Sequence, residues 1–442
     1  MTEFNQQQQG ASRPARGIHL VIAGPGTGKT RTMIERINNT VKEYAVQPEN
    51  LLILTFSRKA AEEIRERLAA SSGKDYNTAF AGTFHSFCLR ILKENSGLYL
   101  SNTGMKSFPD IIDSKLEESI RQQLFMQEPG RFMGIPYDAI IKIMNRRSPF
   151  PAPTAARLSK SGLFTQIEKF REQYRQYKLQ HALIDYDDMM LHAAELLAGN
   201  TAVREELNAK YRFIFIDEFQ DTSHEDFNLL THVAGKDANI FMVGDDYQAI
   251  YRFRGARVEY LVNAAKFFPG ANIHKLTINY RSHSEIVELS NRFIRHNSFR
   301  SKKKIISAKG KGATVMFHRA ESLACETDTI AQIIAAADTN VTCAILCRNN
   351  YQVEKLQRSL SPGSMNLICM TIHASKGLEF DCVIIAGVND AIIPDRDTDI
   401  EDERRLFYVA LTRARSRLHI IYETDDKGAL PRFISECGYS GR

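Results

Sequence analysis

Apolar residues gather in short continuous runs along the chain, and a stretch with helical spacing of apolar positions follows most of them. Continuous apolar runs of this length are typical of strands that are buried on both faces, as in parallel sheets. Alternation of strand and helix indicates an α/β fold. The strand candidates are IHLVIAG (18–24), NLLILTF (50–56), YRFIFIDE (211–218), NIFMVGD (239–245), TCAILCR (342–348) and DCVIIAG (381–387).

The strand candidates form two groups, one before about residue 275 and one after, so we expect two α/β lobes. Helix candidates follow in both groups: RKAAEEIRERLAA (58–70), SHEDFNLLTHVA (223–234) and SEIVELSNRFIRH (284–296). Residues 95–205 are helical and polar, and the prolines of SPFPAPTAARLSKSG (148–162) break any helix there. We predict a helical insertion in the first lobe. The predicted division is 1–94 and 206–275 for the first lobe, 95–205 for the insertion and 276–442 for the second lobe.

Composition describes an ordinary globular chain of 442 residues, 43% of them apolar and 25% charged. No apolar window of about 18 residues is present, so we expect no membrane span. The first residues, MTEFNQQQQGASRPAR, have no apolar core and predict no signal peptide. Seven cysteines without CxxC spacing favour a reducing compartment over a disulfide framework or a zinc site. We therefore expect a cytoplasmic protein.

Net charge is +6, which permits binding to nucleic acid without requiring it. The densest basic stretch is SKKKIISAKGKGA, beginning at Ser301. Two interpretations stay open for it: a solvated loop, which we favour, and a contact with a phosphate backbone.

The stretch AGPGTGKT follows a strand candidate and precedes a helical pattern, which is the context of a P-loop. Its glycines allow backbone N–H groups to surround phosphates, and the start of the helix adds positive potential. We expect Lys29 to reach the β- and γ-phosphates and the Thr30 hydroxyl to bind Mg²⁺. The predicted nucleotide-binding residues of this motif are Gly24, Pro25, Gly26, Thr27, Gly28, Lys29, Thr30 and Arg31.

Two acids follow the strand candidate that ends near Ile216. An acid at the carboxyl end of a strand that faces a P-loop is typical of a second Mg²⁺ ligand. We predict that Asp217 binds the metal and that Glu218 orients and deprotonates the attacking water.

With further segments in order along the chain, these motifs resemble superfamily 1 helicases of the UvrD/Rep type. The resemblance is weakest in 95–205 and near the C-terminus. The segments are FNQQQQGA (4–11), LTFSRKAAEEIRERL (54–68), AGTFHSFCLRIL (81–92), IDYDDMM (184–190), IDEFQDTS (216–223), VGDDYQAIYRFRGA (243–256), INYRSHSEIVELSN (278–291), MTIHASKGLEFDCVII (370–385) and ERRLFYVALTRARSRL (403–418).

The resemblance implies two RecA-like lobes of the P-loop NTPase fold, with ATP in the cleft between them. It assigns adenine recognition to Gln8, stacking on adenine to Tyr280 and a ribose contact to Glu379. It further implies that Arg281 and Arg413 reach the γ-phosphate from the second lobe. A guanidinium there would stabilise the charge of the transferring phosphoryl group and would make hydrolysis depend on lobe closure.

The stretch VGDDYQAIYRFRGA combines a polar sensor, flat rings and positive charge. By the resemblance, Gln248 senses the γ-phosphate, while Tyr251, Phe253 and Arg254 meet a single strand of DNA. Aromatic faces stack on any base, contributing roughly 1–3 kcal/mol per base, and arginine adds charge or cation–π attraction. Phe253 stands where the family usually has tryptophan. The alternative is that the two rings belong to the core.

The resemblance assigns further DNA contacts to Phe56, Thr83, His85 and His373. For the two histidines a purely structural role stays open as the alternative.

Two departures from the family are visible. Only SPGSMN (361–366) stands where relatives insert a large helical domain into the second lobe, and YETDDKGALPRFI (422–434) is short where they have a duplex-splitting hairpin. ATP-driven movement along a strand is therefore better supported than splitting of the duplex.

We expect an ATP-dependent 3′-to-5′ DNA helicase or single-strand translocase that uses ATP and Mg²⁺ and binds single-stranded and tailed duplex DNA. The alternative is a DNA-dependent ATPase that unwinds poorly alone and serves as the motor or end-sensing subunit of a nuclease-linked repair or anti-phage complex.

Overall fold

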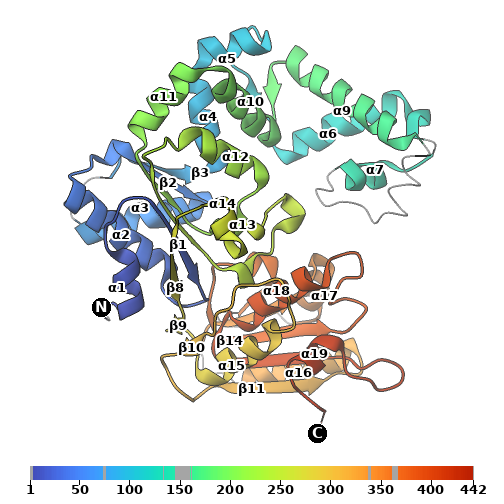
Figure 1. The fold of residues 1–442 in the computed structure, drawn as a ribbon. Helices are drawn as coiled ribbons and strands as arrows, with labels where there is room; N and C mark the ends of the chain where they lie inside the picture. The colour runs from blue at the N-terminus through green and yellow to red at the C-terminus, as the bar shows by residue number, and fades with distance from the viewer. Residues whose placement is uncertain are drawn as a thin grey trace.

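The computed structural model describes residues 3–72, 76–132, 134–144, 160, 162–336, 340–360 and 367–441. It shows an α/β chain with two parallel-sheet lobes and a helical region beside the first of them (Figure 1). The Pro-rich break predicted near Ser148 and the SPGSMN segment lie outside the described residues. Both sheets are open and parallel, in agreement with the predicted fold of two RecA-like lobes.

The first lobe holds a six-stranded parallel sheet in the order β3-β2-β6-β7-β1-β8. Its strands are β1 (Ile18–Ala23), β2 (Leu51–Thr55), β3 (Phe80–Thr83), β6 (Phe213–Ile216), β7 (Asn239–Gly244) and β8 (Asn272–Leu276). Strand β1 lies between β7 and the edge strand β8 and pairs with both, and most of its side chains are buried. The loop after β1 is therefore flanked by the ends of two neighbouring strands.

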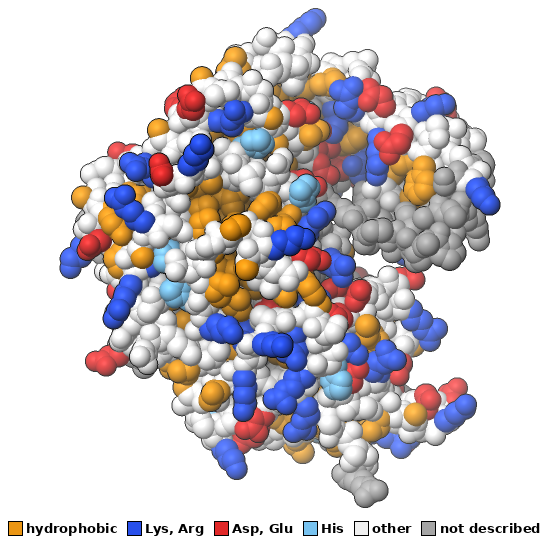
Figure 2. Space-filling model, viewed as in Figure 1, with side chains coloured by type: hydrophobic (Ala, Val, Ile, Leu, Met, Phe, Trp, Pro, Cys, Tyr) orange, Lys and Arg blue, Asp and Glu red, His pale blue; other side chains and the backbone are white. Residues whose placement is uncertain are grey.

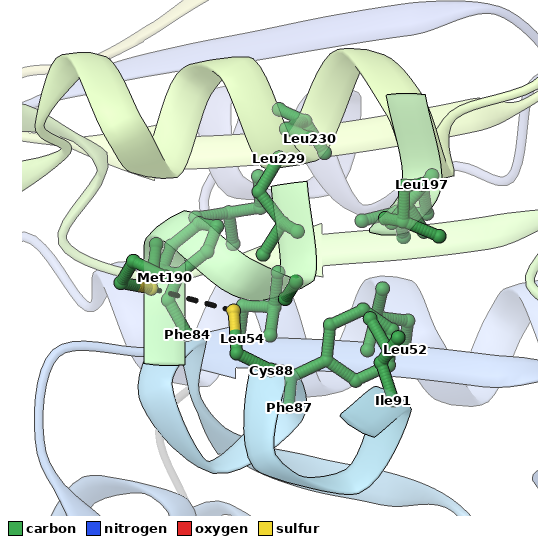
Figure 3. Close-up of a cluster of buried hydrophobic side chains, with 14 of the residues drawn as sticks. Leu52, Leu54, Phe84, Phe87, Cys88, Ile91, Met190, Leu197, Leu229 and Leu230 are labelled. Atoms are coloured by element: carbon green, nitrogen blue, oxygen red, sulfur yellow. Dashed lines mark hydrogen bonds between the residues drawn. The ribbon is translucent and has the colours of Figure 1, made fainter. Parts of the chain in front are cut away.

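Side chains that alternate along these strands form a separate core on each face of the first sheet. One face is covered by α1 (Gln6–Ser12), α2 (Lys29–Tyr44) and α3 (Arg58–Ser72). The other is covered by α4 (Phe84–Glu94), α10 (Tyr186–Gly199) and α12 (His224–Val233), with α5 (Ser96–Thr103), α11 (Thr201–Lys210), α13 (Glu259–Val262) and α14 (Ala264–Phe267) around them. Figure 3 shows Leu52 and Leu54 of β2 among side chains from α4, α10 and α12.

The helical region between β3 and β6 has two parts. Helices α6 (Ser114–Gln127), α7 (Tyr137–Met144) and α9 (Leu163–Gln180) share a core of their own, whereas α4, α10 and α11 contribute to the core of the first lobe. The short strands β4 (Asp110–Ile111) and β5 (Leu183–Ile184) pair with each other in this region. The boundaries predicted at 94/95 and 205/206 are not settled by these cores and stay a prediction.

The second lobe holds a five-stranded parallel sheet in the order β11-β15-β14-β12-β13, and a two-stranded sheet joins β9 to β10. The strands are β9 (Ile278–Asn279), β10 (Ile306–Ser307), β11 (Thr314–Arg319), β12 (Cys343–Cys347), β13 (Leu367–Thr371), β14 (Phe380–Val388) and β15 (Ala414–Tyr422). Helices α15 (Ser284–Ile294), α18 (Ile400–Leu411) and α19 (Arg432–Glu436) pack on one face, and α16 (Leu323–Ala335) and α17 (Asn350–Ser359) on the other. Five cysteines contribute to the α16/α17 face, and all seven are free thiols.

All six predicted strands are present. The strands that the hydrophobic pattern missed stand at or near sheet edges or carry mixed polarity, as β8 and β11 do with exposed positions along their length. A strand with one solvated side does not give a continuous apolar run. Among the described residues, no helix combines the length and apolar character that a membrane crossing requires.

Candidate nucleotide site and nucleic-acid groove

The loop from Gly24 to Gly28 turns sharply between β1 and α2, as the P-loop pattern predicts. Gly26 and Gly28 have φ of 66° and 79°, in the left-handed region that favours glycine. A Cβ on Gly26 would lie 2.6 Å from the Cβ of Arg281, so the second lobe approaches the loop too closely for a side chain there. Among the described residues, no side chain caps the start of α2, which leaves its first N–H groups directed at the loop.

Within the loop, the Thr27 hydroxyl donates to the Gly24 carbonyl (2.8 Å), and the Pro25 carbonyl accepts from the Asn279 side chain (2.8 Å). The Arg31 guanidinium lies over the ring of Phe4, with its central carbon 4.3 Å from the ring centroid. Arg31 therefore contacts the N-terminal segment that carries the glutamine motif.

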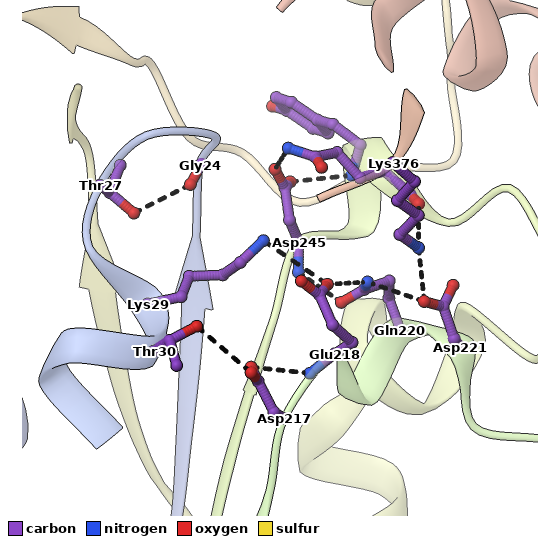
Figure 4. Close-up of polar contacts among 12 residues, drawn as sticks. Gly24, Thr27, Lys29, Thr30, Asp217, Glu218, Gln220, Asp221, Asp245 and Lys376 are labelled. Atoms are coloured by element: carbon purple, nitrogen blue, oxygen red, sulfur yellow. Dashed lines mark hydrogen bonds and ion pairs between the residues drawn. The ribbon is translucent and has the colours of Figure 1, made fainter. Parts of the chain in front are cut away.

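The two acids after β6 face the start of α2 (Figure 4). The Thr30 hydroxyl donates to Asp217 Oδ2 (3.3 Å), and Lys29 Nζ lies 3.6 Å from Glu218 Oε2. Glu218 has φ of 51°, a strained conformation for a residue with a side chain, which turns its carboxylate toward Lys29. The predicted metal ligands and the predicted base are thus brought together with the P-loop.

The pKa values of the two acids move apart. Burial, with the Glu218 charge adding to it, raises the pKa of Asp217 to about 7. Burial also disfavours the charged form of Glu218, but Lys29 and Lys376 outweigh it and lower the pKa of Glu218 to about 2. Glu218 is therefore ionised at neutral pH, as a proton acceptor must be. Asp217 is a buried carboxyl with little cationic compensation, an environment suited to a divalent cation.

A chain of hydrogen bonds runs from Glu218 to the second lobe. Gln220 Nε2 donates to Glu218 Oε2, and Gln220 Oε1 accepts from the Asp245 N–H (2.8 Å). Gln248 Nε2 donates to Asp245 Oδ2 (2.9 Å), and its Oε1 accepts from Arg413 Nη2 (3.1 Å). We call these five residues, with Lys29, the interlobe relay.

Arg413 is held inside the second lobe, with 1% of its surface exposed. Its Nε donates to the Val409 carbonyl and its Nη1 to the Leu378 carbonyl, which leaves Nη2 directed at Gln248. Burial, together with the nearby charge of Arg281, lowers the pKa of Arg413 to about 9, so the side chain stays cationic at neutral pH. The structure therefore brings Arg413 to the predicted sensor Gln248.

Arg281 stands at the outer edge of the same interface. Its Nε donates to Glu379 Oε2 (2.5 Å), its Nη1 donates to the Thr412 carbonyl (3.1 Å), and Glu379 also accepts from Arg415 (2.6 Å). Burial disfavours the Glu379 carboxylate, but Arg281 and Arg415 outweigh this and lower its pKa. Glu379, predicted to meet the ribose, is therefore hydrogen-bonded to Arg281, predicted to meet the γ-phosphate.

The predicted adenine contacts lie together at the N-terminal end of the site. Gln8 is buried, and its Nε2 donates to the Thr27 carbonyl of the loop (3.0 Å). Asn5 caps the short helix α1 and donates to the Tyr280 hydroxyl (2.7 Å). Tyr280 keeps 37% of its surface exposed, so its ring retains a face for stacking.

Four aromatic side chains from three segments form what we call the ring cluster: Phe56, Tyr251, Phe253 and His373. Phe56 and Tyr251 are stacked with centroids 4.4 Å apart, and the Phe253 and His373 rings meet edge to face at 5.7 Å. Phe253 is 58% exposed and Phe56 is 38% exposed, so neither ring is enclosed in the core. Tyr251 is half-buried and also packs against the second-lobe core. It therefore has features of both alternatives, a ring that meets the DNA strand and a ring of the core.

Charge surrounds these rings. The Arg254 guanidinium lies 5.3 Å from the Tyr251 centroid and 5.7 Å from that of Phe253. Burial and the nearby charges of Arg348, Arg254 and Lys376 lower the pKa of His373 to about 4. The His373 ring is therefore neutral at physiological pH and contributes a flat ring rather than charge.

A cavity of about 1080 Å³ lies between the first lobe and helices α9 and α10, and Phe56, Phe253 and Arg254 line one side of it. Thr83 and His85 line it as well. Thr83 also caps α4 by accepting from the Ser86 N–H (3.2 Å), and the His85 ring contacts Tyr186 edge to face. Five of the seven predicted DNA contacts thus border one cavity. The other two, Tyr251 and His373, belong to the adjoining ring cluster.

Two lysines that the sequence did not single out join these regions. Lys376 Nζ forms an ion pair with Asp221, donates to the Gln248 carbonyl (3.0 Å) and lies 4.8 Å from the Tyr251 ring centroid. Lys303 Nζ is fully buried, 2.6 Å from Asp245 Oδ1 and 2.5 Å from Asp246 Oδ1. Lys376 stands three residues after His373 in the motif MTIHASKGLEFDCVII, and this position was the signal available in the sequence. Lys303 lies in the basic stretch that begins at Ser301, and nothing in that stretch distinguished this buried lysine from its exposed neighbours.

Comparison with known families matches both halves of the chain. The model described as UvrD/REP helicase N-terminal domain matches residues 4–269, and the model described as UvrD-like helicase C-terminal domain matches residues 274–370 and 364–425.

Curated relatives support the same grouping. A protein named ATP-dependent DNA helicase PcrA from Staphylococcus aureus (strain Mu50) is 28% identical over 463 residues, covering 99% of this chain and 62% of the relative. Its namesake from Bacillus subtilis (strain 168) is 28% identical over 375 residues, covering 83% of this chain and 50% of the relative. The chain therefore spans 62% or less of the length of these relatives.

Proposed function

Because the chain belongs to the UvrD/REP helicase family, we propose that it is an ATP-dependent DNA motor that moves 3′ to 5′ along single-stranded DNA and displaces the complementary strand. The relay from Glu218 to Arg413 carries this proposal. It connects the P-loop lobe to a second-lobe arginine and passes through Gln248, which lies in the same segment as Tyr251 and Phe253. The 3′-to-5′ direction rests on the family resemblance.

In the proposed reaction, the loop from Gly24 to Gly28 and Lys29 hold the phosphates of ATP, with adenine between Gln8 and Tyr280. Glu218 accepts a proton from the water that attacks the γ-phosphate, and its low pKa keeps it ready for this role. Arg413 and Arg281 stabilise the negative charge that spreads over the transferred phosphoryl group. The phosphates would compete with Glu218 for Lys29, whose Nζ lies 3.6 Å from Glu218 Oε2.

Thr30 and Asp217 are the residues proposed to hold Mg²⁺. The hydroxyl and the buried carboxyl lie 3.3 Å apart, and their oxygens are the donors that this cation prefers. When bound, the ion neutralises phosphate charge.

Coupling between hydrolysis and movement follows from the position of Gln248. Its side chain accepts from Arg413, its backbone carbonyl accepts from Lys376, and three residues later the chain reaches Tyr251. A change at the γ-phosphate that moves Gln248 therefore reaches the ring cluster through a short, largely buried connection. Alternation between tight and loose grip by the two lobes would then produce directed movement.

The decisive test measures ATP hydrolysis with and without a single-stranded oligonucleotide, followed by unwinding of 3′-tailed and 5′-tailed duplexes by the full chain. We expect strong stimulation by the oligonucleotide and unwinding of the 3′-tailed duplex alone. Hydrolysis that is indifferent to DNA would contradict a DNA motor, and unwinding from 5′ tails would contradict the proposed direction.

A second candidate function is a DNA-dependent ATPase that unwinds weakly alone and serves as the motor or end-sensing subunit of a nuclease-linked repair or defence complex. Only residues 360–366 join α17 to β13, and only residues 423–431 join β15 to α19. Neither connection has room for the large insertion or the long hairpin that the family resemblance predicts. Stimulated hydrolysis without unwinding of either tailed duplex would favour this candidate. The domain division at 94/95, 205/206 and 275/276 is part of both proposals.

A further inference from the structure

A second groove, of about 490 Å³, lies on the second lobe between α15 and the segment that leads into β10. It is lined by Ser284, Val287, Glu288, Asn291, Arg292, Arg295, Lys304, Ile305, Ile306 and Ser307. We propose that this α15–β10 groove, with the basic side chains beside it, contacts the phosphate backbone of duplex DNA.

The groove includes part of the basic stretch that sequence analysis left open. In the segment 302–304 the lysines alternate: Lys303 points inward to two carboxylates, whereas Lys302 and Lys304 are exposed. Arg295 is exposed near the end of α15, and Lys309 and Lys311 are exposed in the turn that follows β10. Figure 2 shows Lys and Arg side chains gathered over this part of the second lobe. The stretch thus combines one inward anchor with a charged surface.

Within the described residues, Arg295, Lys302 and Lys304 form no ion pair, and Glu288 is the single acid that lines the groove. Elsewhere in the same lobe, several basic side chains are paired, as Arg404 is with Glu436 at 2.8 Å. Uncompensated positive charge in a concave surface attracts a polyanion and releases its counterions on binding.

The absence of rings indicates which form of nucleic acid suits the groove. Among the described residues that line it there is no aromatic side chain, so it offers no face on which an unpaired base could stack. The ring cluster provides such faces on another part of the molecule. A duplex keeps its bases stacked inside and presents phosphates outward, so charge alone is sufficient to hold it. The two surfaces therefore divide the recognition of single-stranded and double-stranded DNA.

The groove also lies beside the nucleotide site. Ile305, on its floor, packs so closely on Gly24 that an added Cβ there would lie within 2.3 Å of Ile305 Cδ1. Strand β10 pairs with β9, which runs directly into Tyr280. A duplex held in the groove would therefore rest against the segment that supports the adenine contact. This inference rests on the proposed function, since it assigns that motor a second DNA surface.

The test uses the full chain and compares binding of a blunt duplex with binding of an oligo(dT) strand over a range of salt concentrations. The groove variant carries Arg295→Gln, Lys302→Gln and Lys304→Gln, because these exposed side chains form no ion pair with any described residue. Arg292 is kept, since it donates to the Cys437 carbonyl. The control variant carries Arg319→Gln, Lys355→Gln and Arg358→Gln, three exposed basic residues elsewhere on the same lobe.

For the groove variant, we expect a smaller slope in the plot of log affinity for the duplex against log salt concentration. The magnitude of the slope should fall by about 2–3, because each phosphate contact that is lost removes about 0.9. The slope for oligo(dT) and the hydrolysis stimulated by oligo(dT) should stay at wild-type values, as should all slopes of the control. An unchanged duplex slope, or an equal change in the control, would overturn the inference. Hydrolysis by the wild-type chain that does not respond to oligo(dT) would instead overturn the proposed function, so the two failures are distinguishable.

Discussion

The segment 245–253 contributes residues to both the interlobe relay and the ring cluster, yet these two regions are built in opposite ways. The relay is polar and enclosed: Asp245 and Arg413 have at most 1% of their surface exposed, and each bonds to a named partner. The ring cluster is aromatic and open, with Phe253 at 58% exposure. Chemistry at the phosphates requires fixed donors in a dry site, whereas gripping a moving strand requires faces that accept any base.

This difference explains why a single segment can serve both ends. A buried polar network tolerates few arrangements, because each unsatisfied group is expensive in a low dielectric. Exposed rings tolerate many, because stacking depends little on base identity. Loss of a relay residue should therefore change catalysis steeply, and loss of a ring should change affinity moderately.

The largest effect is expected from Glu218→Gln. The amide keeps the shape of the side chain but cannot accept the proton of the attacking water, so turnover should fall by about 10²–10⁴-fold. Binding of ATP should remain, since Lys29 and the loop are intact and the variant removes an anion that competes for Lys29. Single-turnover hydrolysis and binding of a fluorescent ATP analogue measure the two properties. Turnover near the wild-type rate would assign the proton acceptor to another residue.

A smaller loss is expected from Arg413→Lys. Lysine keeps the positive charge but cannot bond at once to Val409, Leu378 and Gln248, so the relay is broken at its second-lobe end. Turnover should fall by about 10²–10³-fold, the usual effect of removing one well-placed donor. Arg417→Lys, at a position further along β15 and outside the relay, is the matched control. Equal losses in both variants would indicate damage to the lobe rather than to the relay.

The sequence predicts some parts of the site and not others. The P-loop and the acids after β6 follow from local rules, since a strand end, a glycine turn and a helix start are adjacent in the chain. The relay joins Gln220, Asp245 and Arg413, which are far apart in sequence, and only the folded chain shows that they belong to one network. Six interior strands were predicted because they form nearly continuous apolar runs, whereas edge strands such as β8, and the interior strand β15 with its partly exposed start, escaped that rule.

Lys303 illustrates the limit most clearly. Its neighbours Lys302 and Lys304 are exposed, and composition gives the three residues the same description. The inward direction of Lys303 depends on Asp245 and Asp246, which approach from the first lobe. A sequence pattern does not encode which member of a basic run will meet a distant carboxylate.

The ring cluster is tested by Tyr251→Ala combined with Phe253→Ala. Stacking contributes roughly 1–3 kcal/mol per base, so affinity for a single strand should fall by about 5–150-fold for each base that no longer stacks. Basal hydrolysis should change little, because the two side chains form no hydrogen bond to a relay residue among those described. Anisotropy with labelled oligo(dT) gives the affinity, and the Tyr260→Phe variant, which keeps a buried first-lobe ring, controls for the fold. Affinity equal to the wild type would place the strand elsewhere.

The smallest effect is expected from Lys376→Met, and it sharpens the comparison because Lys376 belongs to both regions. Its ammonium pairs with Asp221, donates to the Gln248 carbonyl and covers Tyr251. Removing that charge takes away one cation that lowers the pKa of Glu218 and one that faces Tyr251, but Lys29 and Arg254 remain, so basal hydrolysis and strand affinity should fall less than the stimulation of one by the other. Coupling between sites typically corresponds to a fivefold or larger effect, so we expect stimulation to fall by about five- to tenfold.

The pH dependence of this coupling identifies its origin. Burial raises the pKa of Asp221 to about 6, although Lys376 opposes the shift. Above pH 6 the carboxylate is ionised and pairs with Lys376; as pH falls through 6 it takes up a proton and the pair is broken. Stimulation by DNA should therefore decline below pH 6 in the wild-type chain, whereas the Lys376→Met variant, which has no such pair, should stay uniformly low. Lys376→Arg should restore both the stimulation and its decline. A parallel pH profile in the wild type and the Met variant would show that the two regions communicate by a route that does not pass through Lys376.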